Sequence, residues 1–365
     1  MNQRYNFNNR SNYSRKIKLN SAGKALGATV FAAAVMLVVI LIQFSGCGDI
    51  GDVSDISSYV SPDTSSVTSP VEESTENSVP EESEPDAVEL PSLDDIVVTA
   101  WNCYVVNTTT GEVLYSKNAE ERAYPASITK LMTASVALKY CDPSSVFTAG
   151  DELELVGEGS SLAWIKSGMK LKLSMLIDAM LLPSGNDAAY IVAVNVARQV
   201  KNDETLSAQD AVKEFAELMN KEAAAIGCTG TNFVNPDGYH DDNHYSTAED
   251  LAKICQYART FDVICRSVAK EEVKVTYETL ETNKWRNSNY LVCEKLSNGE
   301  PSPWYLPYVT GMKTGSTDEA GKCLAVSAEK DGVEVIAIIL RCNSSDKRFD
   351  EAYKIMTTLF GTGAE

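Results

Sequence analysis

Histidine is nearly absent from this chain, and no cysteine pair has the spacing of a metal-binding motif. Only His240 and His244 occur among 365 residues, and none of the nine cysteines forms a C-x-x-C pair. Zinc sites and Ser-His-Asp triads depend on such residues. The two histidines lie in a polar loop with Asp241 and Asp242, which keeps a metal site or a triad as an alternative. The sequence itself predicts no metal and no cofactor.

Positive charge is missing from residues 48–95, which contain many acids but no Lys or Arg. Residues 1–24, by contrast, carry only positively charged side chains, although the whole chain has a formal charge of −19. An acidic protein repels nucleic acid phosphates, and no basic stripe with interleaved aromatic residues follows. Nucleic acid is therefore excluded as a partner.

Charge of either sign is missing from Ala25 to Phe44. Twenty such residues are long enough to cross a bilayer as a helix. Because the basic residues precede this stretch, residues 1–24 are predicted to be cytoplasmic, 25–46 to be a transmembrane signal anchor or signal sequence, and the remainder to be exported. Phe44-Ser-Gly-Cys47 also resembles a lipoprotein cleavage box, in which Cys47 would carry lipid. An uncleaved anchor is preferred, followed by a lipoprotein and then by a released protein.

The region that follows, residues 47–93, is rich in Ser, Glu and Pro and shows no hydrophobic period. Such a segment cannot bury enough apolar surface to offset its ordering entropy, so we expect a disordered acidic linker. Residues 94–362 are predicted to form a single folded domain. Export would permit disulfides among the cysteines, but their spacing assigns no pairs.

The folded part changes its hydrophobic period along the chain, which predicts a mixed α/β (α+β) domain. Strands are expected at residues 96–106, 112–115, 308–316, 323–328 and 333–340. Helices are expected after Ser127 and at residues 171–182, 187–200, 213–226, 251–258 and 348–360. Because strands lie at both ends and helices between them, the N- and C-terminal strands should join in one antiparallel sheet with an inserted, mainly helical subdomain.

Ser127 and Lys130 are three residues apart at the predicted start of a helix. That spacing places both side chains on one face of the first turn, which brings a nucleophile next to a base. A helix N-terminus also offers unpaired N–H groups that suit an oxyanion. Taken alone, however, Ser-x-x-Lys fits equally well with a helix cap followed by a solvated lysine.

Two further motifs follow in order. Ser184-Gly-Asn186 lies in a tight connection between two helices, where its hydroxyl and amide groups would point into a cleft. Lys313-Thr-Gly315 lies on a strand, where the glycine would allow close backbone approach and the lysine would supply positive charge. Each motif alone also fits an ordinary turn or strand end. The three together match the set that defines serine penicillin-binding proteins and β-lactamases.

The resemblance extends over residues 94–360. It rests on five blocks: Ala126–Ala134, Leu181–Ala189, Phe233–Gly238, Asn243–Ala252 and Gly311–Thr317. Together these resemble low-molecular-mass D-alanyl-D-alanine carboxypeptidases of the β-lactamase/transpeptidase-like superfamily. Three positions depart from the family pattern: Asp237 stands where relatives often have His or Asn, Tyr239 stands where they often have Leu, and Ser316 follows the Lys-Thr-Gly motif.

The resemblance implies a reaction. Ser127 would attack the carbonyl between two D-alanines of a peptidoglycan stem pentapeptide while Lys130 accepts its proton. Ser184 and Lys313 would pass a proton to the leaving D-alanine, and Asn186 would hold Lys130 and a substrate amide. The implied substrate and oxyanion contacts come from Thr314, Gly315 and Ser316, with the N–H groups of Ser127 and Ser316 forming the oxyanion hole.

The resemblance also implies that penicillins acylate Ser127 and that the domain faces the cell wall, anchored in the bacterial membrane by the N-terminal segment. Two alternatives remain. A class A β-lactamase would have Ser-Asp-Asn in place of Ser184-Gly-Asn186, and it would need a loop Glu for deacylation that the sequence does not offer convincingly. A non-catalytic sensor of β-lactams or muropeptides would need a signalling domain, and residues 1–24 contain none that is evident.

Overall fold

The structure, a computed structural model, describes residues 89–277 and 281–363. The predicted segments 1–24 and 25–46, Cys47 and nearly all of the linker lie outside these residues. Within the described part, no helix combines the length and apolar character needed to cross a membrane. The anchor and the lipidated cysteine therefore stay predictions.

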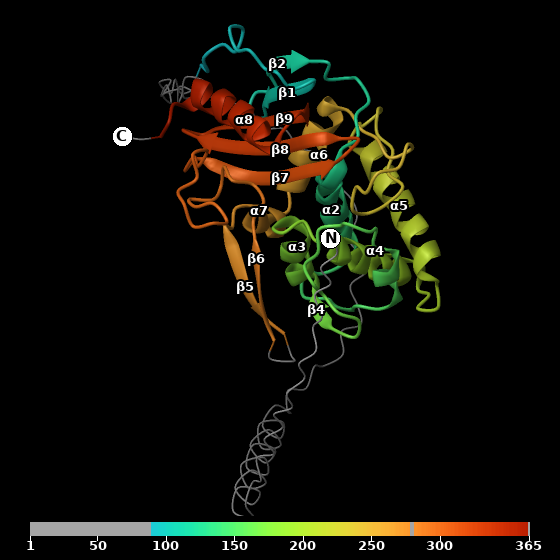
Figure 1. Cartoon of the computed structure of the whole chain (residues 1–365). Helices are drawn as coiled ribbons and strands as arrows, with labels where there is room; N and C mark the ends of the chain where they lie inside the picture. Colours follow the sequence, from blue (N-terminus) through green and yellow to red (C-terminus); the bar gives the residue numbers. More distant parts are fainter. Residues whose placement is uncertain (1–88, 278–280, 364–365) are drawn as a thin grey trace, which may run out of the picture. The chain divides into compact units, whose positions relative to one another are not determined.

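A five-stranded antiparallel sheet joins strands from both ends of the domain, as the sequence predicted. Its strand order is β2 (Val113–Lys117), β1 (Asn102–Asn107), β9 (Val333–Cys342), β8 (Gly321–Lys330) and β7 (Val309–Thr317). Figure 1 shows that β7 forms the edge strand nearest the helical region. The N-terminal hairpin thus pairs with β9, more than two hundred residues later in the sequence.

Both faces of the sheet are buried at β8 and β9, which explains why these strands contain continuous apolar runs. In β9, Ile336 and Ile338 face one hydrophobic cluster, whereas Val335 and Ala337 face the other. One cluster lies under the C-terminal helix α8 (Ser345–Phe360), which contacts β8 and β9. The other joins the opposite face to the helical region.

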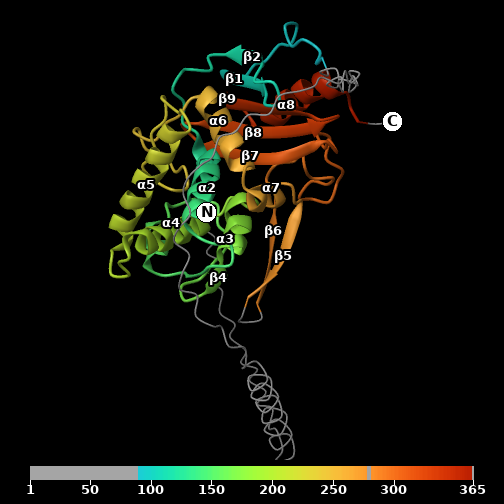
Figure 2. The same cartoon turned by 180° about the vertical axis from the view of Figure 1, so that it is seen from behind.

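Helix α2 (Lys130–Tyr140) is the centre of the helical region and is buried along most of its length. Around it pack α3 (Leu173–Leu181), α4 (Asn186–Lys201), α5 (Ala208–Ala225), α6 (Ala248–Arg259) and α7 (Asp262–Val268). Figures 1 and 2 show α6 against the sheet, with α3, α4 and α5 further away on the same side. This is the predicted helical insertion between the strands.

The helix boundaries follow local chemistry. Thr247 caps helix α6, because its side chain accepts a hydrogen bond from Asp250 N at 3.0 Å. Helix α5 begins earlier than predicted, because Ser207 caps it by accepting from Asp210 N. Helix α4 ends at Asn202, whose left-handed backbone has φ 53°.

Two predicted elements have different boundaries. Residues 96–101 do not join β1. Instead, the carbonyls of Val98 and Ala100 accept hydrogen bonds from Lys117 Nζ, and both residues pack in the cluster under α8. The predicted helix at 171–182 starts only at Leu173, because residues 170–172 form β4 and pair with β3 (Val146–Thr148).

Several short elements were not predicted. They are the 3₁₀ turn η2 (Asp151–Leu155), helix α7, and the two-stranded hairpin of β5 (Glu272–Thr276) and β6 (Thr282–Arg286). Their sequences lack a sustained period, and their positions depend on packing. The eight cysteines in the described part are all free thiols, so no disulfide holds these elements.

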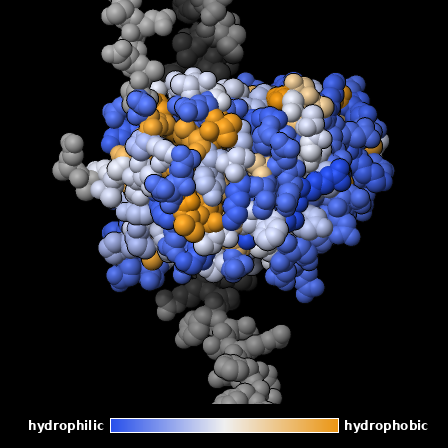
Figure 3. Space-filling view, turned by 90° about the horizontal axis from the view of Figure 1, so that it is seen from above, coloured by the Kyte–Doolittle hydropathy of each residue, from blue (hydrophilic) through white to orange (hydrophobic). Residues whose placement is uncertain are grey.

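The surface over β1, β2 and α8 is mostly hydrophilic, with hydrophobic residues in separate small areas (Figure 3). Val97 and Val113 are among the exposed apolar residues of the N-terminal part of the domain. Isolated exposed apolar residues are normal on soluble domains.

Candidate active site

Ser127 lies in the 3₁₀ turn η1 (Ala126–Thr129), which leads directly into α2, and Lys130 is the first residue of that helix. The turn begins at Ala126, whose φ of 47° is unusual for a residue with a side chain. Lys130 Nζ donates a hydrogen bond to Ser127 Oγ at 2.7 Å. The three-residue spacing therefore brings the hydroxyl and the amine together, as predicted.

Lys130 is fully buried, and its amine is held by three acceptors. Besides Ser127 Oγ, these are Asn186 Oδ1 at 2.8 Å and the carbonyl oxygen of Asp237 at 2.8 Å. Three acceptors match the three protons of an ammonium group. The lysine is thus fixed in direction, with one contact to the serine hydroxyl.

Burial lowers the pKa of Lys130 to about 8, although the carboxylates of Asp237 and Asp187 act in the opposite direction. About one tenth of the amine is therefore neutral at pH 7. The second buried lysine of the site has a lowered pKa as well. Burial, followed by the charges of Lys130 and Arg348, lowers the pKa of Lys313 well below its usual range.

Strand β7 carries the third motif along the edge of the sheet. Lys313 is buried, and its Nζ donates to the carbonyl of Thr314 at 3.1 Å. The hydroxyl of Thr314 is 2.6 Å from that of Ser288. The carbonyl of Gly315 accepts a hydrogen bond from Arg348 Nη1 of α8 at 3.0 Å. Helix α8 therefore supports the catalytic strand from the far face of the sheet.

Gly315 has a role that its sequence context did not reveal. A Cβ atom there would lie 2.9 Å from the carbonyl oxygen of Pro125 and 3.2 Å from Ser127 N. The glycine thus makes room for the backbone of the nucleophile's own turn. This close packing places Ser316, the next residue of β7, beside Ser127 at the cleft.

The second motif connects α3 to α4. Ser184 is buried and has a left-handed backbone with φ 66°. Asn186 is fixed at both ends of its amide, because Oδ1 accepts from Lys130 and Nδ2 donates to Ser160 Oγ at 2.9 Å. Its backbone N–H donates to the carbonyl of Ser161 at 2.8 Å. The loop that contains Ser160 and Ser161 therefore orients a predicted catalytic side chain.

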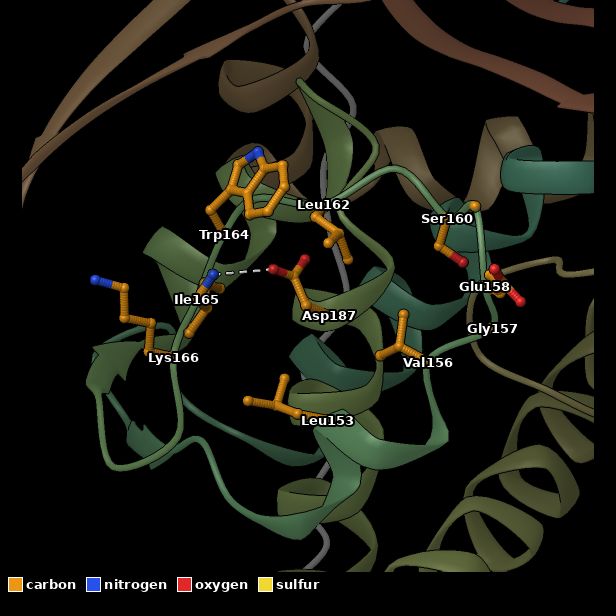
Figure 4. A pocket seen from close by; sticks show the side chains of 11 residues that line it. Leu153, Val156, Gly157, Glu158, Ser160, Leu162, Trp164, Ile165, Lys166 and Asp187 are labelled. Carbon is orange, nitrogen blue, oxygen red and sulfur yellow. Dashed lines mark hydrogen bonds between the residues drawn. The ribbon is translucent and has the colours of Figure 1, made fainter. Parts of the chain in front are cut away.

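Asp187 holds the other end of that loop. Its carboxylate accepts hydrogen bonds from Ala163 N at 2.9 Å and Ile165 N at 3.0 Å, and the second of these is drawn in Figure 4. Behind the loop lies a cavity of about 400 Å³ with apolar walls that include Leu153 and Leu162 (Figure 4). Hydrogen bonds to Asn186 and Asp187 thus hold the loop in place beside this cavity.

The catalytic cleft itself has a volume of about 450 Å³. Of the predicted residues, Ser127, Asn186 and Ser316 line it, whereas Lys130 and Lys313 are buried behind its wall. The sequence reasoning missed the remaining walls, which are Glu158–Ser161, Gly238–His240 and Thr317–Glu319. Those segments carry no motif of their own, and the fold alone brings them to Ser127.

Two residues of the loop before α6 also support the nucleophile. Gly238 has φ 81°, and a Cβ there would lie only 1.9 Å from the carbonyl oxygen of Ala126, so no larger residue fits. His244 is buried. Its Nε2 lies 2.8 Å from Thr129 Oγ1, and its Nδ1 accepts from Val234 N at 3.2 Å.

These contacts give His244 a structural role, and burial lowers its pKa to about 3, which keeps the ring neutral. His240 lies at the cleft wall, edge-on to Tyr124. Neither ring is placed next to Ser127 by a hydrogen bond in the part of the chain that the structure describes. The geometry therefore does not support a Ser-His-Asp triad at this serine, and Lys130 is the ionisable group that bonds to Ser127 Oγ.

A serine paired with a buried lysine, at the edge strand of an antiparallel sheet and opposite a Ser-x-Asn turn, is the arrangement of the penicillin-interacting serine enzymes. Comparison with known families gives the same class, because residues 91–344 match D-alanyl-D-alanine carboxypeptidase. The chain belongs to the D-alanyl-D-alanine carboxypeptidase family of serine peptidases.

Individual relatives agree with this assignment. The D-alanyl-D-alanine carboxypeptidase of Streptomyces sp. strain K15 is 32% identical over 71% of this chain and 86% of its own length. DacF of Bacillus subtilis is 28% identical over 72% of this chain, and DacA of Escherichia coli is 32% identical over 71%. The aligned part spans 62% and 60% of those two proteins.

Solved structures show the same fold. The Streptomyces K15 DD-transpeptidase superposes with a TM-score of 0.63 at 30% identity, covering 72% of this chain and 97% of that one. Penicillin-binding protein D2 of Listeria monocytogenes, solved in an ampicillin-bound form, gives a TM-score of 0.58 at 26% identity, covering 72% and 98%. The predicted fold class is thus confirmed.

Proposed function

We propose that this protein is a serine DD-carboxypeptidase that removes the terminal D-alanine from peptidoglycan stem pentapeptides through a Ser127 acyl-enzyme. The observation that carries the proposal is the buried amine of Lys130, 2.7 Å from Ser127 Oγ and with its pKa lowered to about 8. A general base works best when its pKa lies near the working pH. Penicillins, which mimic the acyl donor, react with the same serine.

Acylation begins when the neutral amine of Lys130 accepts the Ser127 proton. The oxygen of Ser127 then forms a bond to the carbonyl carbon of the penultimate D-alanine. The N–H groups of Ser127 and Ser316 bind the resulting oxyanion, each contributing roughly 3–4 kcal/mol to transition-state stability. The close packing of Gly315 against Ser127 N supports this pairing of donors.

The bond to the last D-alanine then breaks, and its nitrogen needs a proton. Ser184 relays to this nitrogen the proton that Lys130 took from Ser127. Lys313 assists, and the pKa of its buried amine lies well below the usual lysine range. Thr314 and Lys313 receive the terminal carboxylate, and the backbone of β7 pairs with the substrate peptide. Asn186 holds a substrate amide, and water then hydrolyses the acyl-enzyme.

We further propose that residues 25–46 anchor the protein in the bacterial membrane and that residues 47–93 extend the catalytic domain, residues 94–362, towards the cell wall. This proposal rests on the uncharged stretch and its basic flank in the sequence. Lipidation of Cys47 is its alternative. Mass spectrometry of the membrane-extracted protein distinguishes an intact N-terminus from a lipidated Cys47.

The activity is tested with the whole chain in detergent and a pentapeptide that ends in D-Ala-D-Ala. We expect D-alanine release by the wild type and by Ser167→Ala, an exposed serine used as the control, but none by Ser127→Ala. Fluorescent penicillin followed by peptide mapping should give one adduct, on Ser127. Equal D-alanine release by Ser127→Ala and wild type would overturn the proposal.

The same experiment separates the alternatives. Rapid turnover of penicillin without D-alanine release would identify a β-lactamase. A stable Ser127 adduct with no turnover of any peptide would identify a sensor.

A further inference from the structure

A buried carboxyl group beside the catalytic lysine has no part in the mechanism so far. Asp237 is completely buried, and its Oδ1 accepts only a long hydrogen bond of 3.2 Å from Tyr239 N. Its Oδ2 has no hydrogen-bond partner among the described residues. Burial raises the pKa of this carboxyl group and the charge of Lys130 lowers it, so the carboxylate form depends on a compensating positive charge.

Among the described residues, only one positively charged group acts on Asp237. Lys130 of α2 faces it, and its amine bonds to the Asp237 backbone carbonyl. The pKa of Tyr190 on α4 is raised mainly by burial and, to a smaller extent, by the negative charge of Asp237. Tyr239, in the same loop, contributes its backbone N–H. Among the described residues that face Asp237, Lys130 is therefore the one cation.

The other titratable groups around Lys130 are already satisfied or neutral. Asp187 of α4 is bonded to three backbone N–H groups, and His244 is neutral. Lys313 of β7 is a second buried amine, and its charge would oppose that of Lys130. Asp237 is thus the acid best placed to counter a positive charge on the lysine.

We propose that Asp237 is a positioning residue for acylation, whose carboxylate counters the charge of Lys130 and whose backbone carbonyl keeps the lysine amine aimed at Ser127. The inference rests on the proposed role of Lys130 as base. When the Ser127 proton moves to Lys130, the amine becomes an ammonium ion in a buried site. A carboxylate beside it stabilises that ion and hence the transition state.

This role predicts two coupled changes in Asp237→Asn. Without the carboxylate, the ammonium form of Lys130 is less stable, so the acid limb of the acylation rate moves to lower pH by about one unit. The lysine is then also a weaker base, so the rate on the high-pH plateau falls several-fold. A purely structural defect would lower the rate at every pH and leave the midpoint unchanged.

The test measures the second-order rate of acylation of the full-length protein by a fluorescent penicillin between pH 5.5 and 10. Asp241→Asn is the matched control, because Asp241 is an exposed acid in the same loop whose Oδ1 accepts only from Asn243 N. We expect the wild-type midpoint in the control and the lower midpoint in Asp237→Asn. Asp237→His, which also lacks the carboxylate, should likewise have a lower midpoint than the wild type.

Unchanged midpoints in Asp237→Asn and Asp237→His would overturn the inference, as would a loss of rate that is uniform over pH. Thermal unfolding of each variant checks that it is folded. If Asp237→Asn does not fold, the pH profile of Asp237→His decides the test. Failure of the wild type to be acylated would instead overturn the proposed function.

Discussion

Replacing Lys130 by Met removes the proposed base together with a buried ionisable group. The two side chains are similar in length, so the main change is the loss of the amine. Activity should fall by a factor on the order of 10²–10⁴, because general base catalysis is lost. The less obvious consequence is on stability, since the unfolded chain holds the lysine proton more tightly than the folded protein does.

The magnitude follows from the pKa of Lys130, which is 10.5 for the free side chain and about 8 in the folded protein. Between these values the unfolded state binds more protons, so the free energy of unfolding rises with pH. The full difference of 2.5 units corresponds to about 3.4 kcal/mol at 1.36 kcal/mol per unit. From pH 7 to pH 9.5 the wild type should therefore gain about 2 kcal/mol relative to Lys130→Met.

Urea unfolding of both proteins at pH 7 and pH 9.5 measures this difference. Groups other than Lys130 titrate in both proteins, so their contributions cancel to first order. Lys166→Met, which removes an exposed lysine, is the control and should follow the wild type at both pH values. If the stability difference between wild type and Lys130→Met is the same at pH 7 and pH 9.5, the lowered pKa is refuted, and with it the argument for a neutral base.

Three further predictions concern the support of the site. Gly238→Ala should abolish activity or folding, since its Cβ would lie 1.9 Å from the carbonyl oxygen of Ala126; D-alanine release by a folded Gly238→Ala would contradict the packing. Ser160→Ala removes the acceptor for Asn186 Nδ2 and should lower kcat more than it raises KM, as steady-state kinetics on the pentapeptide will measure. The His244 pKa is lowered to about 3, so the wild type should lose stability as the pH falls from 6.5 towards 3, and thermal unfolding of His244→Gln should show a weaker loss.

The strands and helices that the sequence predicted are those with a long, regular hydrophobic period. The β8–β9 hairpin and helices α4 and α8 were located to within a few residues, because each buries a continuous apolar run or stripe. The strand predicted from Ile96 was too long, because Val98 and Ala100 are buried against α8 instead of in the sheet. Apolar side chains show that a segment is buried but not what it packs against.

The same distinction applies to the site. The sequence by itself determined that Ser127 and Lys130 meet, because they are three residues apart in one helical turn. It also contained the two supporting motifs, each confined to one tight connection or one strand. The five blocks of resemblance then indicated the fold and the family. These features are local, and so a sequence can encode them directly.

Only the tertiary structure decided what surrounds that pair. The Asp237 carbonyl bonds to Lys130 across 107 positions of sequence. Gly238 packs under Ala126, and Gly315 makes room for the backbone of the Ser127 turn. Such contacts depend on where distant loops and β7 meet α2, and no local spacing encodes that meeting. The burial that lowers the pKa of Lys130 is likewise a property of the folded domain, because a lysine becomes a base near neutral pH only when the chain excludes water from it.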